Sequence, residues 1–228
     1  MKVGVLFSGG KDSTFAAYLA RERGDELACL ITLSPLRLDS YMFHFPNIRW
    51  TAMQAEAMHL PQVMLETKGV KEEELVDLRR AIETAKHDYS IEGVYTGALA
   101  SVYQKSRVER ICDELAVKAV SPLWQIDPIS HLTNIIARGF EVTMTGVAAL
   151  GLDESWLGRG LDNDAIRDLA KLHAKYGVNP GLEGGEGETF VLDCPLFDRR
   201  IRVTSSKKHW EGDAGYLEIL EARLVAKG

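Results

Sequence analysis

Residues 3–13 read VGVLFSGGKDS, a short apolar run that leads directly into a glycine turn and the start of a predicted helix. The apolar run does not alternate with polar residues, which indicates a strand buried on both faces, as in a parallel sheet. The pattern from Asp12 to Arg23 predicts a helix that ends at Gly24. A strand, a glycine turn and a helix N-terminus in this order bind phosphate, because backbone amides and the helix dipole point at the anion.

Each polar residue of SGGKDS suits a phosphate site. Ser8 and Ser13 offer hydroxyl donors, and Lys11 offers a positive charge. Asp12 among phosphates is explained best as a Mg²⁺ ligand. A tight turn that only caps a helix is the alternative, but six specified positions directly after the first strand favour a nucleotide site. The spacings GxxxxGK[ST] and GxGxxG are absent, which disfavours ordinary γ-phosphoryl transfer and dinucleotide binding.

The first half of the chain alternates β-rich runs with helical patterns, which predicts a Rossmann-like parallel sheet with helices on both faces. Further strands are predicted at 27–33, 62–65, 94–96 and 117–120, and helices at 51–60, 71–89 and 106–115. The pattern changes after Pro122, so we predict a nucleotide-binding domain at 1–122 and a smaller α+β substrate-binding domain at 123–228. In the second domain we predict helices at 129–138 and 163–176 and strands at 141–147, 189–192, 201–204 and 216–225.

The composition is that of an ordinary soluble globular chain, with 46% hydrophobic and 26% charged residues among 228. The formal net charge of −6 disfavours a protein whose main task is to bind nucleic-acid phosphates. Cys29, Cys112 and Cys194 form no CxxC or Cys/His pair, so we expect three buried hydrophobic side chains and no zinc or paired redox centre. Neither a membrane span nor a signal peptide is recognisable, so we expect a cytoplasmic protein.

Two stretches follow predicted strands at the edge where a parallel sheet binds ligands. DSYMFHFPN, residues 39–47, follows the second strand, whose end at Leu33 and Ser34 should border the nucleotide. His44 in this stretch is a candidate contact, although a hydrogen-bonded structural histidine is the alternative. GALASVYQKSRVE, residues 97–109, follows the fourth strand, and its small residues allow the backbone to approach a ligand closely.

The polar residues of GALASVYQKSRVE differ in how strongly they suggest function. Gln104 and Arg107 offer donors to a phosphate or carboxylate, and we favour a functional role for both. For Lys105 an ordinary surface charge at a helix start is nearly as good an explanation.

A third stretch, EGGEGET at residues 183–189, interleaves carboxylates with glycines. Like charges this close repel one another, so Mg²⁺ or an ammonium group would relieve the repulsion. A flexible acidic loop is the alternative. Among the three glutamates we favour Glu186, because a glycine on each side lets its carboxylate approach a ligand closely.

SGGKDS resembles the PP-loop of the N-type ATP pyrophosphatases, which are adenine-nucleotide alpha-hydrolase-like enzymes that cleave ATP between the α and β phosphates. Together with DSYMFHFPN, GALASVYQKSRVE, SPLW, GLDESWLGR and EGGEGETFVLDCPLF, it resembles the diphthine–ammonia ligase family in the family's order, from Ser8 to Phe197. The chain departs from that family at Val102, where an acidic residue is common, and at Gly187, where an aromatic residue is common.

The resemblance implies that the diphthine carboxylate of translation elongation factor 2 is adenylated and then attacked by ammonia, giving diphthamide, AMP and pyrophosphate. It implies ATP and Mg²⁺ as cofactors, elongation factor 2 as protein substrate and free ammonium as nitrogen source. We expect neither nucleic acid nor membrane as a partner, and the sequence leaves the oligomeric state open, a homodimer included. The alternatives are a PP-loop tRNA-modifying enzyme, although thiolating members generally rely on reactive cysteines, and a non-catalytic ATP-binding sensor domain.

The residues and the resemblance together predict three sets of site residues. Catalytic roles are predicted for Asp12, Glu186 and Glu188, with Asp12 also the metal ligand. The predicted nucleotide-binding residues are Ser8, Gly9, Gly10, Lys11, Asp12, Ser13, Leu33, Ser34, His44, Gly97 and Ala98. The predicted substrate-binding residues are Tyr103, Gln104, Arg107, Glu183, Gly184, Gly185, Glu186, Glu188 and Thr189. Diphthine carries a trimethylammonium group, so Tyr103, Trp124 or Trp156 is expected to supply cation–π contact.

Overall fold

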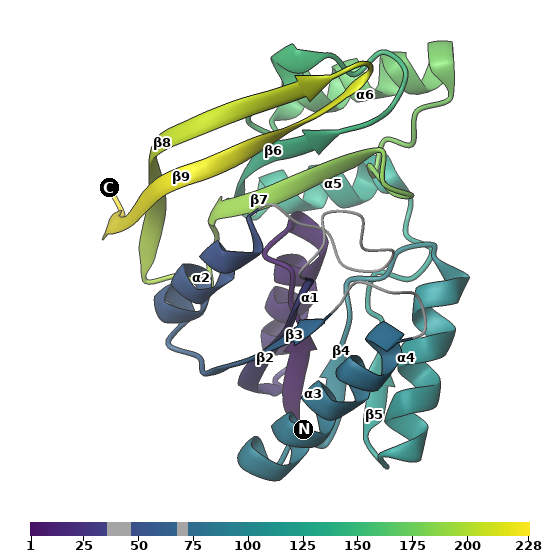
Figure 1. The fold of residues 1–228 in the computed structure, drawn as a ribbon, viewed down its shortest axis with the longest axis vertical. Coiled ribbons are helices and arrows are strands. Elements are labelled where there is room, and N and C mark those ends of the chain that lie inside the picture. The colour runs from purple at the N-terminus through teal and green to yellow at the C-terminus, as the bar shows by residue number, and fades with distance from the viewer. Residues whose placement is uncertain (36–46, 68–72) are drawn as a thin grey trace. The chain divides into compact units, whose positions relative to one another are not determined.

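A computed structural model of the chain describes residues 1–35, 47–67 and 73–228. The chain forms two compact units, Met1–Trp124 and Gln125–Gly228. Figure 1 shows a sheet flanked by helices in the first unit and a second sheet with its own helices in the other. No helix among the described residues is long and apolar enough to cross a lipid bilayer.

The first unit is built on a five-stranded parallel sheet with the strand order β3-β2-β1-β4-β5. Its strands are β1 (Lys2–Leu6), β2 (Glu26–Pro35), β3 (Gln62–Thr67), β4 (Gly93–Tyr95) and β5 (Lys118–Val120). Its helices are α1 (Lys11–Glu22), the short η1 (Ile48–Trp50), α2 (Thr51–Met58), α3 (Glu73–Tyr89) and α4 (Val102–Glu114). The parallel sheet predicted from the alternation of strand and helix patterns is confirmed.

Helices pack on this sheet through two separate sets of buried side chains. Cys29, Ile31 and Leu33 alternate along β2 and pack in one core cluster with α3 and α4. Helix α1 contacts β1, β2 and β4 and buries residues outside that cluster, such as Phe15 and Ala17. Both faces of the central strands are therefore buried, which explains why their sequences are apolar without alternation.

The order of the strands places a ligand-binding position at the end of β1. The chain adds β2 and β3 on one side of β1, whereas β4 and β5 lie on the other side. In such a sheet the loops that follow the two central strands diverge, and ligands bind at the carboxyl ends of these strands. Here those are the loops after β1 and β4, which pair in register at Val5 and Tyr95.

The second unit contains a four-stranded antiparallel sheet with the order β7-β6-β9-β8. Its elements are α5 (Pro128–Ala137), β6 (Glu141–Val147), η2 (Glu154–Trp156), α6 (Asn163–Tyr176), β7 (Gly187–Asp193), β8 (Arg199–Glu211) and β9 (Ala214–Ala226). The Asp127 carboxylate caps α5 by accepting the Ser130 N–H at 2.8 Å, and the Asp162 carboxylate caps α6 by accepting the Ala165 N–H at 2.8 Å. Both helices begin where a capping residue precedes the apolar pattern.

Three elements differ from their predicted bounds for identifiable reasons. Helix α4 begins at Val102 rather than Ser106, because the Ser101 hydroxyl caps it by accepting the Gln104 N–H at 3.2 Å. Strand β8 continues to Glu211 instead of ending at 204, since it pairs with β9 along its length although all but one of its side chains are exposed or half-buried and it lacks a clear apolar alternation. Strand β7 begins at Gly187 rather than Thr189. Residues 71–72 of the predicted helix 71–89 lie outside the described residues.

All three cysteines are buried, as the sequence predicts. Cys29 and Cys112 lie in the core cluster of the first unit, and Cys194 follows β7. Burial raises the pKa of each thiol to about 12. A thiol with such a pKa is almost entirely protonated near neutral pH and is a poor nucleophile.

We predict that none of the three cysteines of the native protein is alkylated by iodoacetamide at about pH 8, because the thiolate is the reacting species. Intact-mass spectrometry should show the unmodified chain, and the same reagent should modify all three thiols after unfolding in guanidinium. Rapid alkylation of the native protein would contradict this burial.

Candidate functional site

The loop between β1 and α1 has the geometry of an anion site. Gly9 adopts φ +78°, a left-handed conformation that favours glycine, and Gly10 precedes the first helical residue without any side-chain cap. The hydroxyls of Ser8 and Ser13 lie 3.2 Å apart, and the Ser8 N–H donates to the Ser13 hydroxyl at 3.3 Å. The loop is thus closed by its own serines around the N-terminus of α1, where the helix dipole favours a negative charge.

Lys11 and Asp12 form an ion pair at the start of α1. The Lys11 side chain is only 3% exposed, and its Nζ lies 2.8 Å from Oδ2 of Asp12, which is 21% exposed. Within the described part of the chain, no three His, Cys, Asp or Glu side chains are grouped so that they could hold a metal ion. Mg²⁺ that is bound through substrate phosphates needs only one or two protein carboxylates. Asp12 could therefore bind Mg²⁺ together with phosphates, whereas the described residues do not form a metal site made of protein side chains alone.

A buried glutamine of α2 supports the loop, and the sequence analysis did not identify it. Gln54 is fully buried, and its Nε2 donates to the carbonyl oxygen of Gly9 at 2.9 Å. A Cβ at Gly9 would lie 2.3 Å from Oε1 of Gln54, so this contact also requires glycine. The sequence could have indicated this role, because Gln54 lies among the apolar residues of TAMQAEAM. An amide buried in such a helix needs a polar partner.

A second set of buried hydrogen bonds holds the carbonyl group that precedes the loop. The Thr32 hydroxyl on β2 donates to the Phe7 carbonyl oxygen at 2.8 Å. The Gln62 amide on β3 donates to the hydroxyls of Thr32 and Thr51 at 2.7 and 2.8 Å. Side chains from β2, β3 and α2 therefore fix the path of the backbone that enters the anion site.

The loop after β4 meets the first turn of α1 at Gly97. A Cβ at Gly97 would lie 2.7 Å from both the carbonyl carbon of Asp12 and the nitrogen of Ser13, closer than a side-chain atom approaches a backbone. The Thr96 hydroxyl accepts the Ala98 N–H at 3.1 Å and holds the turn. The structure thus brings the predicted glycines after β4 together with SGGKDS, although they are separated by more than eighty residues in the sequence.

Of three other predicted nucleotide contacts, Leu33, Ser34 and His44, the structure describes the first two. The Leu33 side chain packs in the core with α3 and α4, so at this position only the main chain could contact a ligand. Ser34 is half-buried near the end of β2. His44 lies outside the described residues, as does the rest of 39–46.

Helix α4 carries the predicted substrate residues of the first unit. Tyr103, Gln104 and Arg107 are all half-buried, and the Arg107 guanidinium lies 4.1 Å from the centroid of the Tyr103 ring. Lys105 forms an i,i+4 ion pair with Glu109 and lies 5.2 Å from the centroid of the Trp124 ring. An ordinary helix-surface charge therefore accounts for Lys105.

The acidic stretch is a turn that continues into a strand. Gly184 and Gly185 adopt φ values of +74° and +84°, so the backbone itself requires these two glycines. The Glu186 carboxylate accepts the Asn179 N–H at 2.5 Å. Residues 187–189, which include Glu188 and Thr189, belong to β7 and pair with β6. The structure therefore gives Glu186 a hydrogen bond that closes the turn, whereas we expected its carboxylate to be directed at a ligand.

The two departures from the family pattern lie in different surroundings. Val102 is 68% exposed at the first position of α4, where another side chain fits without a change in packing. A Cβ at Gly187 would lie 3.0 Å from Cδ2 of Leu182 and 3.3 Å from the Gly146 carbonyl oxygen. An aromatic side chain at position 187 would therefore require Leu182 to move.

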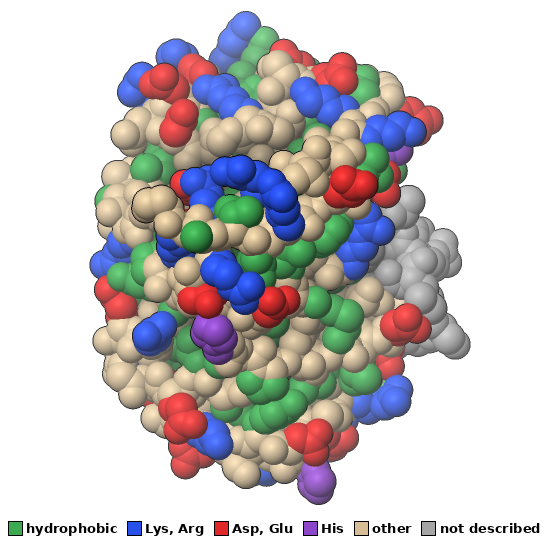
Figure 2. Space-filling view, turned by 90° about the vertical axis from the view of Figure 1, so that its left-hand side faces the viewer, with side chains coloured by type: hydrophobic (Ala, Val, Ile, Leu, Met, Phe, Trp, Pro, Cys, Tyr) green, Lys and Arg blue, Asp and Glu red, His purple; other side chains and the backbone are tan. Residues whose placement is uncertain are grey.

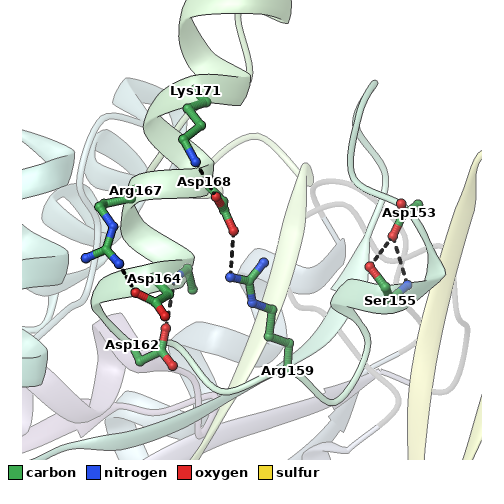
Figure 3. Close-up of polar contacts among 9 residues, drawn as sticks. Asp153, Ser155, Arg159, Asp162, Asp164, Arg167, Asp168 and Lys171 are labelled. Carbon is green, nitrogen blue, oxygen red and sulfur yellow. Dashed lines mark hydrogen bonds and ion pairs between the residues drawn. The ribbon is translucent and has the colours of Figure 1, made fainter.

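The stretch GLDESWLGR forms a polar network next to α6 in the second unit. Figure 3 shows Asp168 between Arg159 and Lys171, at 2.8 Å from the guanidinium and 2.9 Å from the ammonium group. The hydrogen bonds from Lys171 and Arg159 lower the pKa of Asp168 to about 2. These contacts join Arg159, in the segment after η2, to α6. The stretch GLDESWLGR therefore has a structural role in the second unit.

The three aromatic residues expected to contact a trimethylammonium group each have a cation of this chain near one ring face. Arg107 lies over Tyr103 and Lys105 over Trp124. The Arg159 guanidinium lies 4.3 Å from the Trp156 ring centroid, and Trp156 is only 5% exposed. The chain therefore already uses cation–π contact at these rings.

Comparison with known families gives two matches that together span most of the chain. The family model of the diphthamide synthase N-terminal domain matches residues 1–119, and that of the diphthamide synthase C-terminal domain matches residues 127–225.

Individual proteins are similar along their whole length. The diphthine–ammonia ligase of Homo sapiens is 36% identical over 252 residues, which covers 100% of this chain and 94% of that protein. The diphthine–ammonia ligase of Mus musculus is 38% identical over 243 residues, which covers 98% of this chain and 91% of that protein. Among solved structures, a predicted subunit of a tRNA methyltransferase from Methanocaldococcus jannaschii aligns with a TM-score of 0.46 and 16% identity, covering 86% of this chain and 98% of that chain.

We predict that Gly97→Ala weakens ATP binding about tenfold or more, because a methyl group there must displace the Asp12–Ser13 backbone. The overpacking should also cost about 1–3 kcal/mol of the free energy of unfolding. Isothermal titration calorimetry and chemical denaturation measure the two effects.

Gly160→Ala is the matched control for this variant, since a Cβ at Gly160 would approach nothing closer than the Val142 carbonyl oxygen at 4.0 Å. The control should bind ATP like the original protein. Unchanged ATP affinity in Gly97→Ala would mean that the first turn of α1 does not bind the phosphates.

Proposed function

The chain belongs to the diphthamide synthase family, and we propose that it is the ATP-dependent ligase that joins ammonia to the diphthine carboxylate of elongation factor 2. The observation that carries this proposal is the match of both family domains, in order, along nearly the whole chain. Diphthine–ammonia ligases of similar length support it, since they align from end to end with this chain. The reaction class is therefore formation of a carbon–nitrogen bond.

The proposed reaction has two steps. A carboxylate oxygen of diphthine attacks the α-phosphorus of ATP, the bond between the α-phosphorus and the bridging oxygen breaks, and pyrophosphate leaves. The nitrogen of ammonia then attacks the acyl carbon of the adenylate, the carbon–oxygen bond to AMP breaks, and the amide forms. Ammonium must lose one proton before the attack and the new amide nitrogen another, so the second step needs a general base.

The first unit supplies the groups that suit the phosphates in this reaction. Ser8, Ser13 and the N-terminus of α1 donate hydrogen bonds, and Lys11 contributes a positive charge that is already fixed by its ion pair. Fixed donors stabilise the charge that develops on departing pyrophosphate without reorganising. Asp12 would hold Mg²⁺ together with the phosphates, and this ion would neutralise part of their charge.

The second unit, in this proposal, binds the diphthine-bearing protein. The acidic turn at 183–186 and the adjacent Glu188 give it negative potential that suits a trimethylammonium group and an incoming ammonium ion. Glu186 is proposed as the general base. Its hydrogen bond with Asn179 holds one carboxylate oxygen in place, which would fix the direction of the carboxylate.

We predict that the protein sustains the production of AMP and pyrophosphate only when ATP, ammonium and diphthine-bearing elongation factor 2 are all present, because without ammonia the reaction stops at the adenylate. Chromatography of the nucleotides and mass spectrometry of the elongation factor measure both products. ADP in place of AMP would contradict cleavage between the α and β phosphates, and ATP binding without any product would favour a sensor domain.

Asp12→Asn should abolish turnover while keeping the fold, because the amide oxygen can still accept a hydrogen bond from Lys11.

We predict that Glu186→Gln lowers the rate of amidation about a hundredfold, a typical effect of losing a general base, and leaves ATP affinity nearly unchanged. The glutamine keeps a carbonyl oxygen that can accept the Asn179 N–H, so the turn should stay closed. Single-turnover kinetics at saturating ammonium measure the effect.

Glu186→Ala separates the chemical role from the structural one, since it removes both the charge and the acceptor oxygen. Normal amidation by Glu186→Gln together with loss in Glu186→Ala would show that the carboxylate only closes the turn. Equal loss of ATP binding and amidation in Glu186→Gln would place the turn in the nucleotide site.

A further inference from the structure

Strands β8 and β9 form a long antiparallel ribbon in which two arginines face each other. Arg202 on β8 pairs in register with Arg223 on β9, and both side chains are exposed. In the described ladder, β6 pairs with β9 only near the other end of the ribbon, at Gly215 and Tyr216. Like charges directly opposite each other destabilise a β-ladder, so this arrangement works against the stability of the ribbon.

The neighbouring arginines have carboxylate partners, whereas this pair has none within the described residues. Arg199 lies 3.4 Å from Asp198, and Arg200 forms an ion pair with Glu141. Apart from the main-chain pairing of the ladder, no side-chain hydrogen bond or ion pair joins Arg202 or Arg223 to any residue that the structure describes. The two guanidinium groups therefore keep their full charge and donor capacity for an external partner.

Protection of the sheet edge explains some of the positive charge on this ribbon but not the arginine pair. β8 is the edge strand, and exposed charges such as Lys207 and Lys208 discourage unwanted strand pairing there. Arg223 lies on β9 well beyond Gly215 and Tyr216, the positions that pair with β6, so one charged side chain on each strand could discourage pairing there, whatever its sign. Two arginines directly opposite each other add repulsion that a carboxylate on one of the strands would avoid while protecting the edge equally well.

We propose that Arg202 and Arg223 form the centre of a docking surface for an acidic, extended segment of the protein substrate. This inference rests on the proposed function, because it takes the diphthine-bearing elongation factor as the partner. Figure 2 shows several Lys and Arg side chains, interspersed with Asp and Glu, on one face of the molecule. Carboxylates of the partner would relieve the repulsion between the two arginines, and Arg binds carboxylates in a bidentate manner.

Two observations favour a polypeptide over a nucleic acid as the occupant. The chain has a formal net charge of −6, which opposes the many phosphate contacts on which nucleic-acid affinity depends. The outer edge of β8 has no strand beside it in the described sheet, and an extended polypeptide can add to such an edge through main-chain hydrogen bonds. A nucleic acid has no equivalent way to use this edge.

The double variant Arg202→Glu/Arg223→Glu tests the docking surface, with purified diphthine-bearing elongation factor 2 as the probe. We expect the association rate at low salt to fall about tenfold and its salt dependence to weaken, because such charges act mainly on encounter. The KM for the elongation factor should rise about as much, while kcat and ATP affinity stay within about twofold. An unchanged association rate and KM would overturn the proposal.

Arg80→Glu/Arg110→Glu is the matched control, since both arginines are exposed on helices of the first unit and the change in net charge is the same. It should bind the elongation factor within about twofold of the original protein. An equal loss in the control would mean that net charge, rather than the arginine pair, sets the rate, and would overturn the proposal.

Arg223→Glu alone separates docking from stability. It places a carboxylate opposite Arg202, and opposite charges across a ladder stabilise it. We therefore expect an equal or higher Tm together with slower association. Slower association accompanied by a lower Tm would overturn the proposal, because damage to the ribbon would then explain it.

Two further outcomes separate the possible failures. If the double variant loses affinity for bulk tRNA but not for the elongation factor, the surface binds nucleic acid and the proposal is overturned. If the original protein binds the elongation factor but forms no AMP, the proposed function fails, and the binding comparison still decides the docking surface because it requires no turnover.

Discussion

The first unit depends on one close approach of two backbones, at the point where Gly97 meets the Asp12–Ser13 peptide of α1. The strand order makes β1 and β4 neighbours, so the loops that follow them must share the same small space. Because Gly97 has no side chain, the loop after β4 leaves room for the first turn of α1 at Asp12 and Ser13. The anion site is therefore a consequence of sheet topology and of a glycine at position 97.

Buried polar side chains support the loop between β1 and α1, which has the geometry of an anion site. Gln54 binds the carbonyl of Gly9, and Thr32 binds the carbonyl of Phe7. Both carbonyls are directed into the protein by these bonds, which suits a loop whose N–H groups serve a ligand. Fully buried amides and hydroxyls are costly unless they are hydrogen-bonded, so this support also helps to specify a single loop conformation.

The chain distinguishes charges that hold the fold from charges that remain available. Asp168 binds Arg159 and Lys171, and Glu186 closes its turn through Asn179. Arg202 and Arg223, in contrast, oppose each other without partners in the part of the chain that the structure describes. Charges with internal partners stabilise the second unit, whereas this arginine pair stabilises nothing within it.

Features that depend on local pattern could be predicted from the amino-acid sequence. The buried strand before SGGKDS follows from an apolar run without alternation, the helix at 163–176 follows from its apolar spacing, and the burial of the cysteines was expected from the absence of any cysteine pair. Tertiary structure decided what depends on distant residues: Gln54 reaches Gly9 from 45 positions away, and Gly97 meets α1 only because the sheet aligns their loops. It also set the length of β8 and the hydrogen bond between Glu186 and Asn179, because a largely exposed ribbon has no clear apolar alternation and a flanking glycine does not set the direction of a carboxylate.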